Sequence, residues 1–200
     1  MRIVRLCCLL VLAGAAFSAN AKMVHRAVDW TLDGTKFHSV LIYDDATTAK
    51  RPGLVMVPNW YGVNDGAVKK AEAIAGSDYV ILLTDMYGET VRPTTNEQAQ
   101  AAVKPLYGDR ALMRQRIGHA LDQLKAQAGT APLDVARLGA IGFCFGGSAV
   151  LDLARSGADV GAVVSFHGGL DTDNPALAKN IKARVLVLNG ADDKGTMPAA

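Results

Sequence analysis

Cysteine is scarce in this chain of 200 residues, which has only three. Cys7 and Cys8 lie within the first 21 residues, so Cys144 is the one thiol of the remaining chain. A single thiol cannot close an internal disulfide, which excludes a framework of internal disulfides. Cys144 is therefore either a buried, inert residue or a thiol kept free for chemistry.

The apolar run near the N-terminus, residues 6–17, is too short to span a bilayer comfortably. Two arginines precede it, and the small residues Ala19-Asn20-Ala21 follow it. This order predicts a secretory signal peptide over residues 1–21. We expect the mature domain, residues 22–200, to be secreted, with the bacterial periplasm as its location and no membrane attachment after cleavage.

Net charge is lacking as well. The whole chain has 21 lysines and arginines against 19 aspartates and glutamates, and residues 1–21 hold two of the arginines and no acid. Removing those two arginines leaves 19 basic residues against 19 acidic ones. We therefore expect no nucleic-acid or polyanion partner.

Strand and helix patterns alternate through the mature domain. Residues 24–43 hold two alternating apolar runs separated by Asp33-Gly34, which predicts an antiparallel hairpin. Later apolar runs predict buried strands of a parallel sheet over residues 53–58, 79–83, 138–143, 160–165 and 185–189. This order predicts one α/β domain with a mostly parallel sheet, an N-terminal antiparallel hairpin and helices on both faces.

Two helical regions have clear signals. Asn64 is a candidate cap for a helix that Gly76 ends. A longer helical region begins near Glu97, and an apolar stripe in its second part predicts core packing: Met113, Ile117, Ala120, Leu121 and Leu124. We expect the polar side of that region to face solvent, namely Arg110, Arg114, Arg116 and His119.

The segment from Gly142 to Gly147 has the pattern of a nucleophile elbow, with Cys144 in the place of serine. Glycines are needed there because the strand and helix backbones nearly touch. The Phe145 amide would face a developing oxyanion. The helix N-terminus is expected to favour the thiolate and so to lower the pKa of Cys144. The alternative is a small buried residue in a glycine-rich turn, and Ser148 is expected only to pack.

Two further strand ends have candidate functional groups. The strand over residues 53–58 ends in "NWYGVND", where the Trp60 amide is the candidate second oxyanion donor. The alternative is that Trp60 is a core or lid aromatic. The strand over residues 185–189 is followed by Asp192 and Asp193, and Asp193 is the candidate acid of a triad. The alternative is that both are acids of a turn.

Five segments together resemble the dienelactone hydrolase family of α/β-hydrolases: "LVMVPNWYGVND", "YVILLTDMYGE", "LGAIGFCFGGSAV", "AVVSFHGGL" and "VLVLNGADD". They occur in family order between about residues 53 and 193. The resemblance implies the α/β-hydrolase fold and a Cys-His-Asp triad. It also implies hydrolysis of a small-molecule ester or lactone, of carboxymethylenebutenolidase type, with no metal and no organic cofactor.

The resemblance also assigns residues. It implies Cys144 as the nucleophile and Asp193 as the acid, with the amides of Trp60 and Phe145 as the oxyanion hole. The expected pocket residues are Asn59, Tyr87 and His167.

This chain departs from the family pattern at two pocket positions. Asn59 stands where dienelactone hydrolases have a glutamate, and an asparagine cannot accept the thiol proton. Glu89 stands where they have an arginine suited to a substrate carboxylate, although Arg92 is close in sequence. The resemblance therefore does not assign an acidic dienelactone as the substrate.

No histidine follows Asp193, although the triad order requires one there. We therefore expect the last helix-strand-helix part of the fold, roughly 40 residues, to be missing from this sequence. We therefore expect residues 22–200 to be an incomplete α/β-hydrolase domain with poor activity. His167 follows a strand and is a weak substitute base, whereas His25, His38 and His119 are expected to be structural or exposed.

Two alternatives of other classes remain. One is a non-catalytic small-molecule-binding protein of α/β-hydrolase fold that has lost its base. The other is a secreted thiol sensor in which Cys144 is oxidised reversibly. Neither alternative requires an oxyanion donor or an acid after the later strand.

Overall fold

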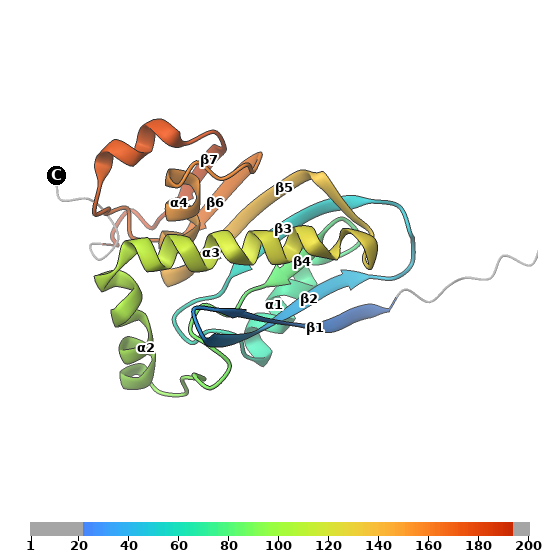
Figure 1. The fold of residues 1–200 in the computed structure, drawn as a ribbon, viewed down its shortest axis with the longest axis horizontal. Coiled ribbons are helices and arrows are strands. Elements are labelled where there is room, and N and C mark those ends of the chain that lie inside the picture. Colours follow the sequence, from blue (N-terminus) through green and yellow to red (C-terminus); the bar gives the residue numbers. More distant parts are fainter. Residues whose placement is uncertain (1–21, 194–200) are drawn as a thin grey trace, which may run out of the picture.

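The computed structural model describes residues 22–193, and these residues form one seven-stranded sheet with the strand order β1-β2-β4-β3-β5-β6-β7 (Figure 1). The strands are β1 (Met23–Leu32), β2 (Thr35–Asp44), β3 (Arg51–Val57), β4 (Val80–Leu83), β5 (Leu133–Phe143), β6 (Ala162–Phe166) and β7 (Arg184–Leu188). Neighbouring strands from β4 to β7 in this order are parallel. The predicted α/β fold is confirmed. The predicted leader, residues 1–21, lies outside the described residues.

The predicted N-terminal hairpin is confirmed. β1 and β2 pair antiparallel from Met23↔Asp44 to Leu32↔Thr35. Asp33 and Gly34 both have positive φ, 49° and 77°, as the tight turn between twisted strands requires. β2 also pairs antiparallel with β4, which joins the hairpin to the parallel part of the sheet.

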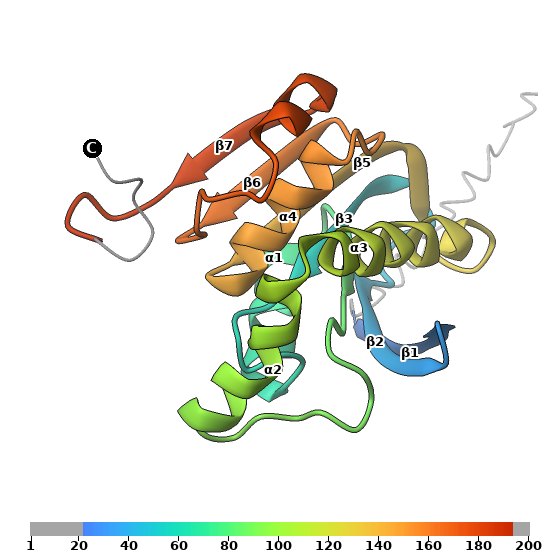
Figure 2. The same cartoon turned by 60° about the vertical axis from the view of Figure 1, so that its left-hand side comes forward.

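Helices lie on both faces of the sheet, as predicted. They are α1 (Asp65–Ala75), α2 (Asn96–Gly108), α3 (Arg110–Lys125) and α4 (Phe145–Arg155), with short 3-10 helices η1 (Ala126–Gly129) and η2 (Pro175–Asn180). α3 and α4 pack on one face and α1 on the other (Figure 2). Asn64 caps α1 by accepting a hydrogen bond from the Ala67 amide, 2.9 Å, and Gly76 ends that helix with φ 44°.

The helices and strands differ from the predicted ones at two places. The single helical region expected from Glu97 is two helices, because Asp109 leaves the helical conformation at φ −132° and caps α3 through the Leu112 amide, 2.9 Å. β5 begins at Leu133, five residues before the predicted start. Its first residues pair with the start of β3, and the register of this pairing shifts between Pro52 and Gly53. A bulge of this kind leaves no apolar pattern in the sequence.

The expectation that Arg110 and Arg114 face solvent is wrong. Arg110 is buried, and its Nε lies 2.9 Å from an oxygen of Asp152, a fully buried residue of α4. Arg155 and Arg114 also approach Asp152, at 3.0 and 3.6 Å. Three cations therefore surround one carboxylate between α3 and α4, a buried cluster that an apolar stripe cannot reveal.

This cluster also holds the chain that follows β6. Arg155 Nη2 donates to the Leu170 carbonyl, 2.9 Å, and Arg110 Nη2 donates to the Asp171 carbonyl, 2.9 Å. The loop after β6 is therefore tied to α3 and α4. That loop begins with His167, so the cluster helps to place one edge of the candidate site.

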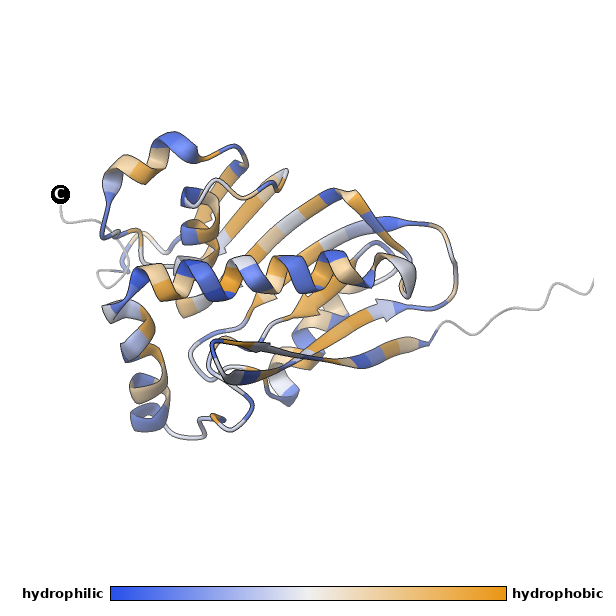
Figure 3. Ribbon diagram, viewed as in Figure 1, coloured by the Kyte–Doolittle hydropathy of each residue, from blue (hydrophilic) through white to orange (hydrophobic). Residues whose placement is uncertain are grey.

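Apolar residues concentrate on the strands and on the inner sides of the helices (Figure 3). On the α1 face, however, an open apolar hollow of about 550 Å³ lies over β5 and β6, where Leu54, Ile141 and Val164 line it. The edge strand β7 exposes four consecutive apolar side chains, Val185 to Leu188, each 39–51% exposed. Helical cover on this face is thus confined to α1 within residues 22–193. None of the helices in that range has the length and apolar character needed to cross a membrane.

Replacing Asp152 by alanine should lower the free energy of unfolding by about 3–5 kcal/mol, because it leaves buried arginines without their carboxylate. Asp122→Ala is the control, since Asp122 forms only an exposed pair with Lys125 at 3.8 Å and should cost less than about 1 kcal/mol. Urea unfolding followed by circular dichroism measures both variants. Equal midpoints for the two would show that the buried cluster does not stabilise the fold.

Candidate active site

Cys144 occupies the tight turn between β5 and α4. It has φ 55° and ψ −116°, a left-handed conformation that a side chain adopts only under strain. Its amide donates to the Phe166 carbonyl of β6, 2.8 Å, and its carbonyl accepts from the Gly147 amide, 2.8 Å. Both strand and helix therefore fix the residue in the geometry of a nucleophile elbow.

The glycines of this turn are required by close backbone approach. A Cβ at Gly142 would overlap the Gly146 carbonyl, and a Cβ at Gly146 would overlap the Val57 carbonyl at the end of β3. At Gly147 it would lie 2.6 Å from Ser165 Oγ. The helix start is thus pressed against the ends of β3 and β6, which is why the spacing of glycines around Cys144 could be recognised from the sequence.

The thiol of Cys144 is half-buried and resists ionisation. Burial raises its pKa, and the negative charge of Asp193 adds to that rise, whereas a hydrogen bond from the Phe145 amide lowers it. The expected lowering by the helix N-terminus is present, but the net shift of the Cys144 pKa is upward. The amide acts in the expected direction, but loss of water around the sulfur outweighs it.

Aromatic rings surround Phe145, the first residue of α4. The Tyr87 ring lies 5.5 Å and the Tyr107 ring 5.7 Å from the Phe145 ring. Tyr107 Oη lies 3.3 Å from Ser148 Oγ, which joins α2 to α4. Burial is the largest cause that raises the pKa of both tyrosines. Tyr107 was not anticipated, because it belongs to no motif.

The turn after β3 lies close to the elbow. The Val57 and Pro58 carbonyls lie against Gly146, and Trp60 follows two residues later. The Trp60 carbonyl accepts a hydrogen bond from the Tyr87 hydroxyl, 3.0 Å, which fixes this turn against the Tyr87 ring.

Asn59 forms hydrogen bonds within its own turn. Its side-chain oxygen accepts from the Tyr61 amide, 3.1 Å, and its carbonyl accepts from the Gly62 amide, 2.9 Å. Asn59 also lines a cavity of about 240 Å³ beside α1, together with Lys70 and Phe143. It therefore borders the face of the sheet opposite to Tyr87 and Phe145.

Asp193 and His167 contact each other at the carboxyl edge of the sheet. His167 Nδ1 pairs with Asp193 Oδ2, and the His167 amide donates to the Leu188 carbonyl, 2.9 Å. His167 has φ 58°, a strained conformation for a residue other than glycine. The Cys144 amide binds the carbonyl of Phe166, the residue before His167, so Cys144, His167 and Asp193 lie at the same edge of the sheet. No hydrogen bond joins the His167 ring to Cys144 among the described residues.

The other three histidines lie elsewhere. His25 pairs with Glu72 and His38 with Asp29, each at 2.6 Å. His119 lies beside the Trp30 ring, at 5.2 Å between ring centroids. Between residues 22 and 193, no group of three His, Cys, Asp or Glu side chains is placed to hold a metal ion.

The elbow, the strand order and the position of Asp193 together define a protein of α/β-hydrolase type. The sequence model of the dienelactone hydrolase family matches residues 38–199. The chain therefore belongs to the dienelactone hydrolase family.

Individual relatives agree with this assignment. A Bradyrhizobium protein named "Probable 2-oxo-3-(5-oxofuran-2-ylidene)propanoate lactonase" is 31% identical over 156 residues, which cover 74% of this chain and 60% of that protein. The solved structure m3DLH is 42% identical, with a TM-score of 0.80, and the match covers 88% of this chain and 72% of that one. A dienelactone hydrolase-like promiscuous phosphotriesterase from metagenomic libraries is 38% identical, with a TM-score of 0.79 over 86% of this chain and 70% of its own. The chain thus spans 60% of the length of that curated relative.

Gly146→Ala should prevent the elbow from forming, because the new methyl group would overlap the Val57 carbonyl. We expect a thermal midpoint lower by more than about 5 °C, which corresponds to a loss above about 1–2 kcal/mol. Gly118→Ala is the matched control, since it lies in α3 with open space at Cβ and should be neutral or stabilising. Differential scanning fluorimetry compares them. A Gly146→Ala protein as stable as the Gly118→Ala protein would contradict the close approach.

The pH dependence of alkylation should report the raised pKa of Cys144. Only the thiolate reacts, so the rate with iodoacetamide should rise at a higher pH than for a free cysteine. Asp193→Asn removes one charge that raises this pKa, so the profile should shift to lower pH. Asp192→Asn is the control and should leave the profile in place. A shift of equal size in both variants would show that Asp193 does not act specifically on the thiol.

Proposed function

We propose that the complete protein hydrolyses a small carboxylic ester or lactone through Cys144. The observation that carries the proposal is the strained elbow, which presents the thiol beside the Phe145 amide at the carboxyl edge of the sheet. The relative from Bradyrhizobium, whose name gives it as a lactonase, supports a lactone as one substrate.

The chemistry follows from the positions of the groups. A base removes the Cys144 proton, and the thiolate attacks the substrate carbonyl to form a tetrahedral intermediate. The amides of Phe145 and Trp60 donate to its oxyanion. The intermediate expels the alcohol, which takes the proton from the base, and leaves an acyl-enzyme. Water, deprotonated by the same base, then attacks the acyl carbonyl, and the thiolate leaves and recovers its proton.

Among the described residues, no side chain that could act as a base forms a hydrogen bond with the Cys144 thiol. The raised pKa of Cys144 means that the resting thiol is neutral, so a base is needed for attack. Asn59 cannot serve, because an amide does not accept a proton at neutral pH and its oxygen already binds the Tyr61 amide. We propose that the base is a histidine beyond residue 200, oriented by Asp193, and that residues 1–200 alone are poorly active.

His167 is a second candidate for the base. Its Nδ1 already faces Asp193, which leaves Nε2 as the nitrogen that could take a proton. The absence, among the described residues, of a hydrogen bond between the His167 ring and Cys144 favours the first candidate. The two assignments predict different hydrolytic activities for a protein in which His167 is replaced.

The proposed location is the bacterial periplasm, on the basis of the leader pattern in residues 1–21. The neutral resting thiol suits an oxidising compartment, because oxidation proceeds through the thiolate.

Cys144→Ala should abolish hydrolysis of 4-nitrophenyl acetate above the background rate, since it removes the proposed nucleophile and residues 22–200 have no other thiol. His167→Gln should keep activity within about threefold of the parent if the base is a later histidine, and should lose about 100-fold or more if His167 is the base. Initial rates and acyl-enzyme mass measured on the longer protein and on residues 22–200 separate the cases. Full activity in the Cys144→Ala protein would exclude the proposed nucleophile.

A further inference from the structure

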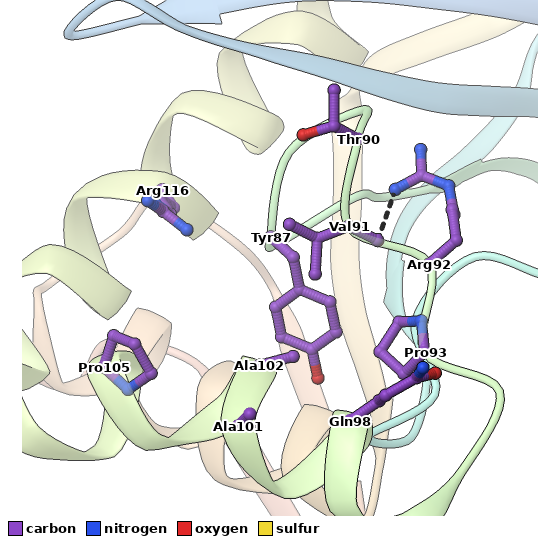
Figure 4. Close-up of a pocket in the computed structure, with 10 residues that line it drawn as sticks. All are labelled: Tyr87, Thr90, Val91, Arg92, Pro93, Gln98, Ala101, Ala102, Pro105 and Arg116. Atoms are coloured by element: carbon purple, nitrogen blue, oxygen red, sulfur yellow. Dashed lines mark hydrogen bonds between the residues drawn. The ribbon is translucent and has the colours of Figure 1, made fainter.

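Tyr87 contacts both residues whose amides are the candidate oxyanion donors. Its hydroxyl donates to the Trp60 carbonyl at 3.0 Å, and its ring centroid lies 5.5 Å from that of Phe145. Tyr87 is buried, and Figure 4 shows its ring in the wall of a cavity that Pro93 and Ala102 also line. The Tyr87 side chain therefore connects the turn after β3 to the start of α4.

The turn after β3 spans residues 59–62 and is closed by one backbone hydrogen bond. The Gly62 amide donates to the Asn59 carbonyl at 2.9 Å. Trp60 is the second residue of this four-residue turn, so its own amide takes no part in closing it. Within residues 22–193, the Trp60 amide donates to no other backbone group. It is therefore available to a ligand atom, in a direction set by whatever holds the turn.

The Tyr87 side chain holds this turn at two points. The first is the hydrogen bond from its hydroxyl to the Trp60 carbonyl. The second is Gly62, where an added Cβ would lie 3.2 Å from Cε2 of the Tyr87 ring. Gly62 has φ 71°, a left-handed conformation that suits glycine. Burial raises the pKa of Tyr87, so the phenol stays protonated and remains a hydrogen-bond donor.

The backbone of Tyr87 is fixed by the buried carboxylate of Asp85. Asp85 Oδ1 accepts from the Tyr87 amide at 2.9 Å and from the Gly88 amide at 3.1 Å. Its Oδ2 accepts from the His38 amide of β2 at 3.2 Å and lies 3.1 Å from Arg92 Nη2, which neutralises the charge. The Tyr87 ring is thus projected from a segment that is tied to the sheet.

Arg116 secures the same segment from α3. It was expected to face solvent, but it is half-buried, and Figure 4 shows it on the α3 side of Tyr87. Its Nη1 donates to the Met86 carbonyl at 2.7 Å, and its guanidinium lies over the Phe37 ring at 5.2 Å. Residues 85–88 are therefore held both by the sheet and by a helix.

We propose that Tyr87 is the positioning residue of the oxyanion hole. By bonding the Trp60 carbonyl and packing on Phe145, it sets the distance between the two amides that donate to the oxyanion. Donors that are held in place before the reaction need no reorganisation when charge develops. The hydroxyl is essential to this role, because without it the Trp60 carbonyl loses its partner and the turn can move. The proposal rests on the proposed function.

Tyr87→Phe removes the hydroxyl and keeps the ring. With 4-nitrophenyl acetate and the complete protein, we expect kcat to fall about tenfold or more and KM to stay unchanged, because the two amides act on the oxyanion and not on the bound ester. Alkylation of Cys144 by iodoacetamide forms no oxyanion, so its rate should stay within about twofold of the parent. A general disturbance of the fold would change both reactions.

Tyr43→Phe is the matched control, since it also removes one phenol hydroxyl. Tyr43 lies near the end of β2, which pairs antiparallel with β4, so it is at the edge of the sheet opposite to the elbow. It lines a separate cavity there, together with Thr130 and Pro132. We expect kcat, KM and the alkylation rate of this variant to match those of the parent.

Amide hydrogen exchange, measured by NMR on the complete protein, tests the turn independently of catalysis. In Tyr87→Phe, the amides of Tyr61 and Gly62 should exchange about fivefold or more faster, because their bonds to Asn59 require a closed turn. The Asp78 amide, which bonds a carbonyl at the end of α1, is the internal reference and should keep its rate.

Three results would each overturn the proposal: an unchanged kcat in Tyr87→Phe, equal losses of hydrolysis and alkylation, or unchanged exchange at Gly62. Faster exchange at Gly62 in the variant of a protein that does not hydrolyse esters would refute the hydrolase and sustain the positioning of the turn by Tyr87. Hydrolysis at the same kcat in parent and Tyr87→Phe would refute the positioning role and sustain the hydrolase.

Discussion

The close approach of backbone to backbone at the elbow is the constraint on which the rest of the structure depends. α4 starts so near to the ends of β3 and β6 that Gly146 has no room for a methyl group beside the Val57 carbonyl. This contact sets the height of the helix over the sheet and forces Cys144 into its strained conformation. The buried Asp152, two turns further along α4, then secures the same helix to α3 and to the loop after β6. Fold and site are thus held by one helix.

The chemistry of the thiol follows from that placement. Because α4 is pressed into the sheet, the sulfur at its start loses water, and this loss outweighs the amide that would stabilise a thiolate. A thiol with a raised pKa stays protonated near neutral pH. Such an arrangement makes the reactivity of Cys144 depend on a base, in contrast to cysteines whose pKa is lowered by a nearby cation or metal ion.

Local patterns predicted the parts of the fold that depend on local rules. The Asp33-Gly34 hairpin, the Asn64 cap and the glycines around Cys144 each require particular residues at fixed spacing, so the sequence revealed them. Properties that depend on what packs opposite were missed. The apolar stripe on α3 predicted which side of that helix packs on the sheet. It did not predict that α4 places Asp152 against Arg110 on the polar side of α3. The sign of the Cys144 pKa shift was missed for the same reason, because burial is a property of the assembled layers.

The edge strand β7 has a physical consequence of its own. Its side chains point alternately to the two sides of the sheet, and all four from Val185 to Leu188 are exposed, so neither side is sheltered. Its outer backbone groups have no strand beside them within residues 22–193. An apolar, unpaired edge of this kind is a template for strand addition between molecules. In a longer protein, the strand expected beyond residue 200 would occupy this edge, and the apolar side chains of β7 would then be covered from within the same molecule.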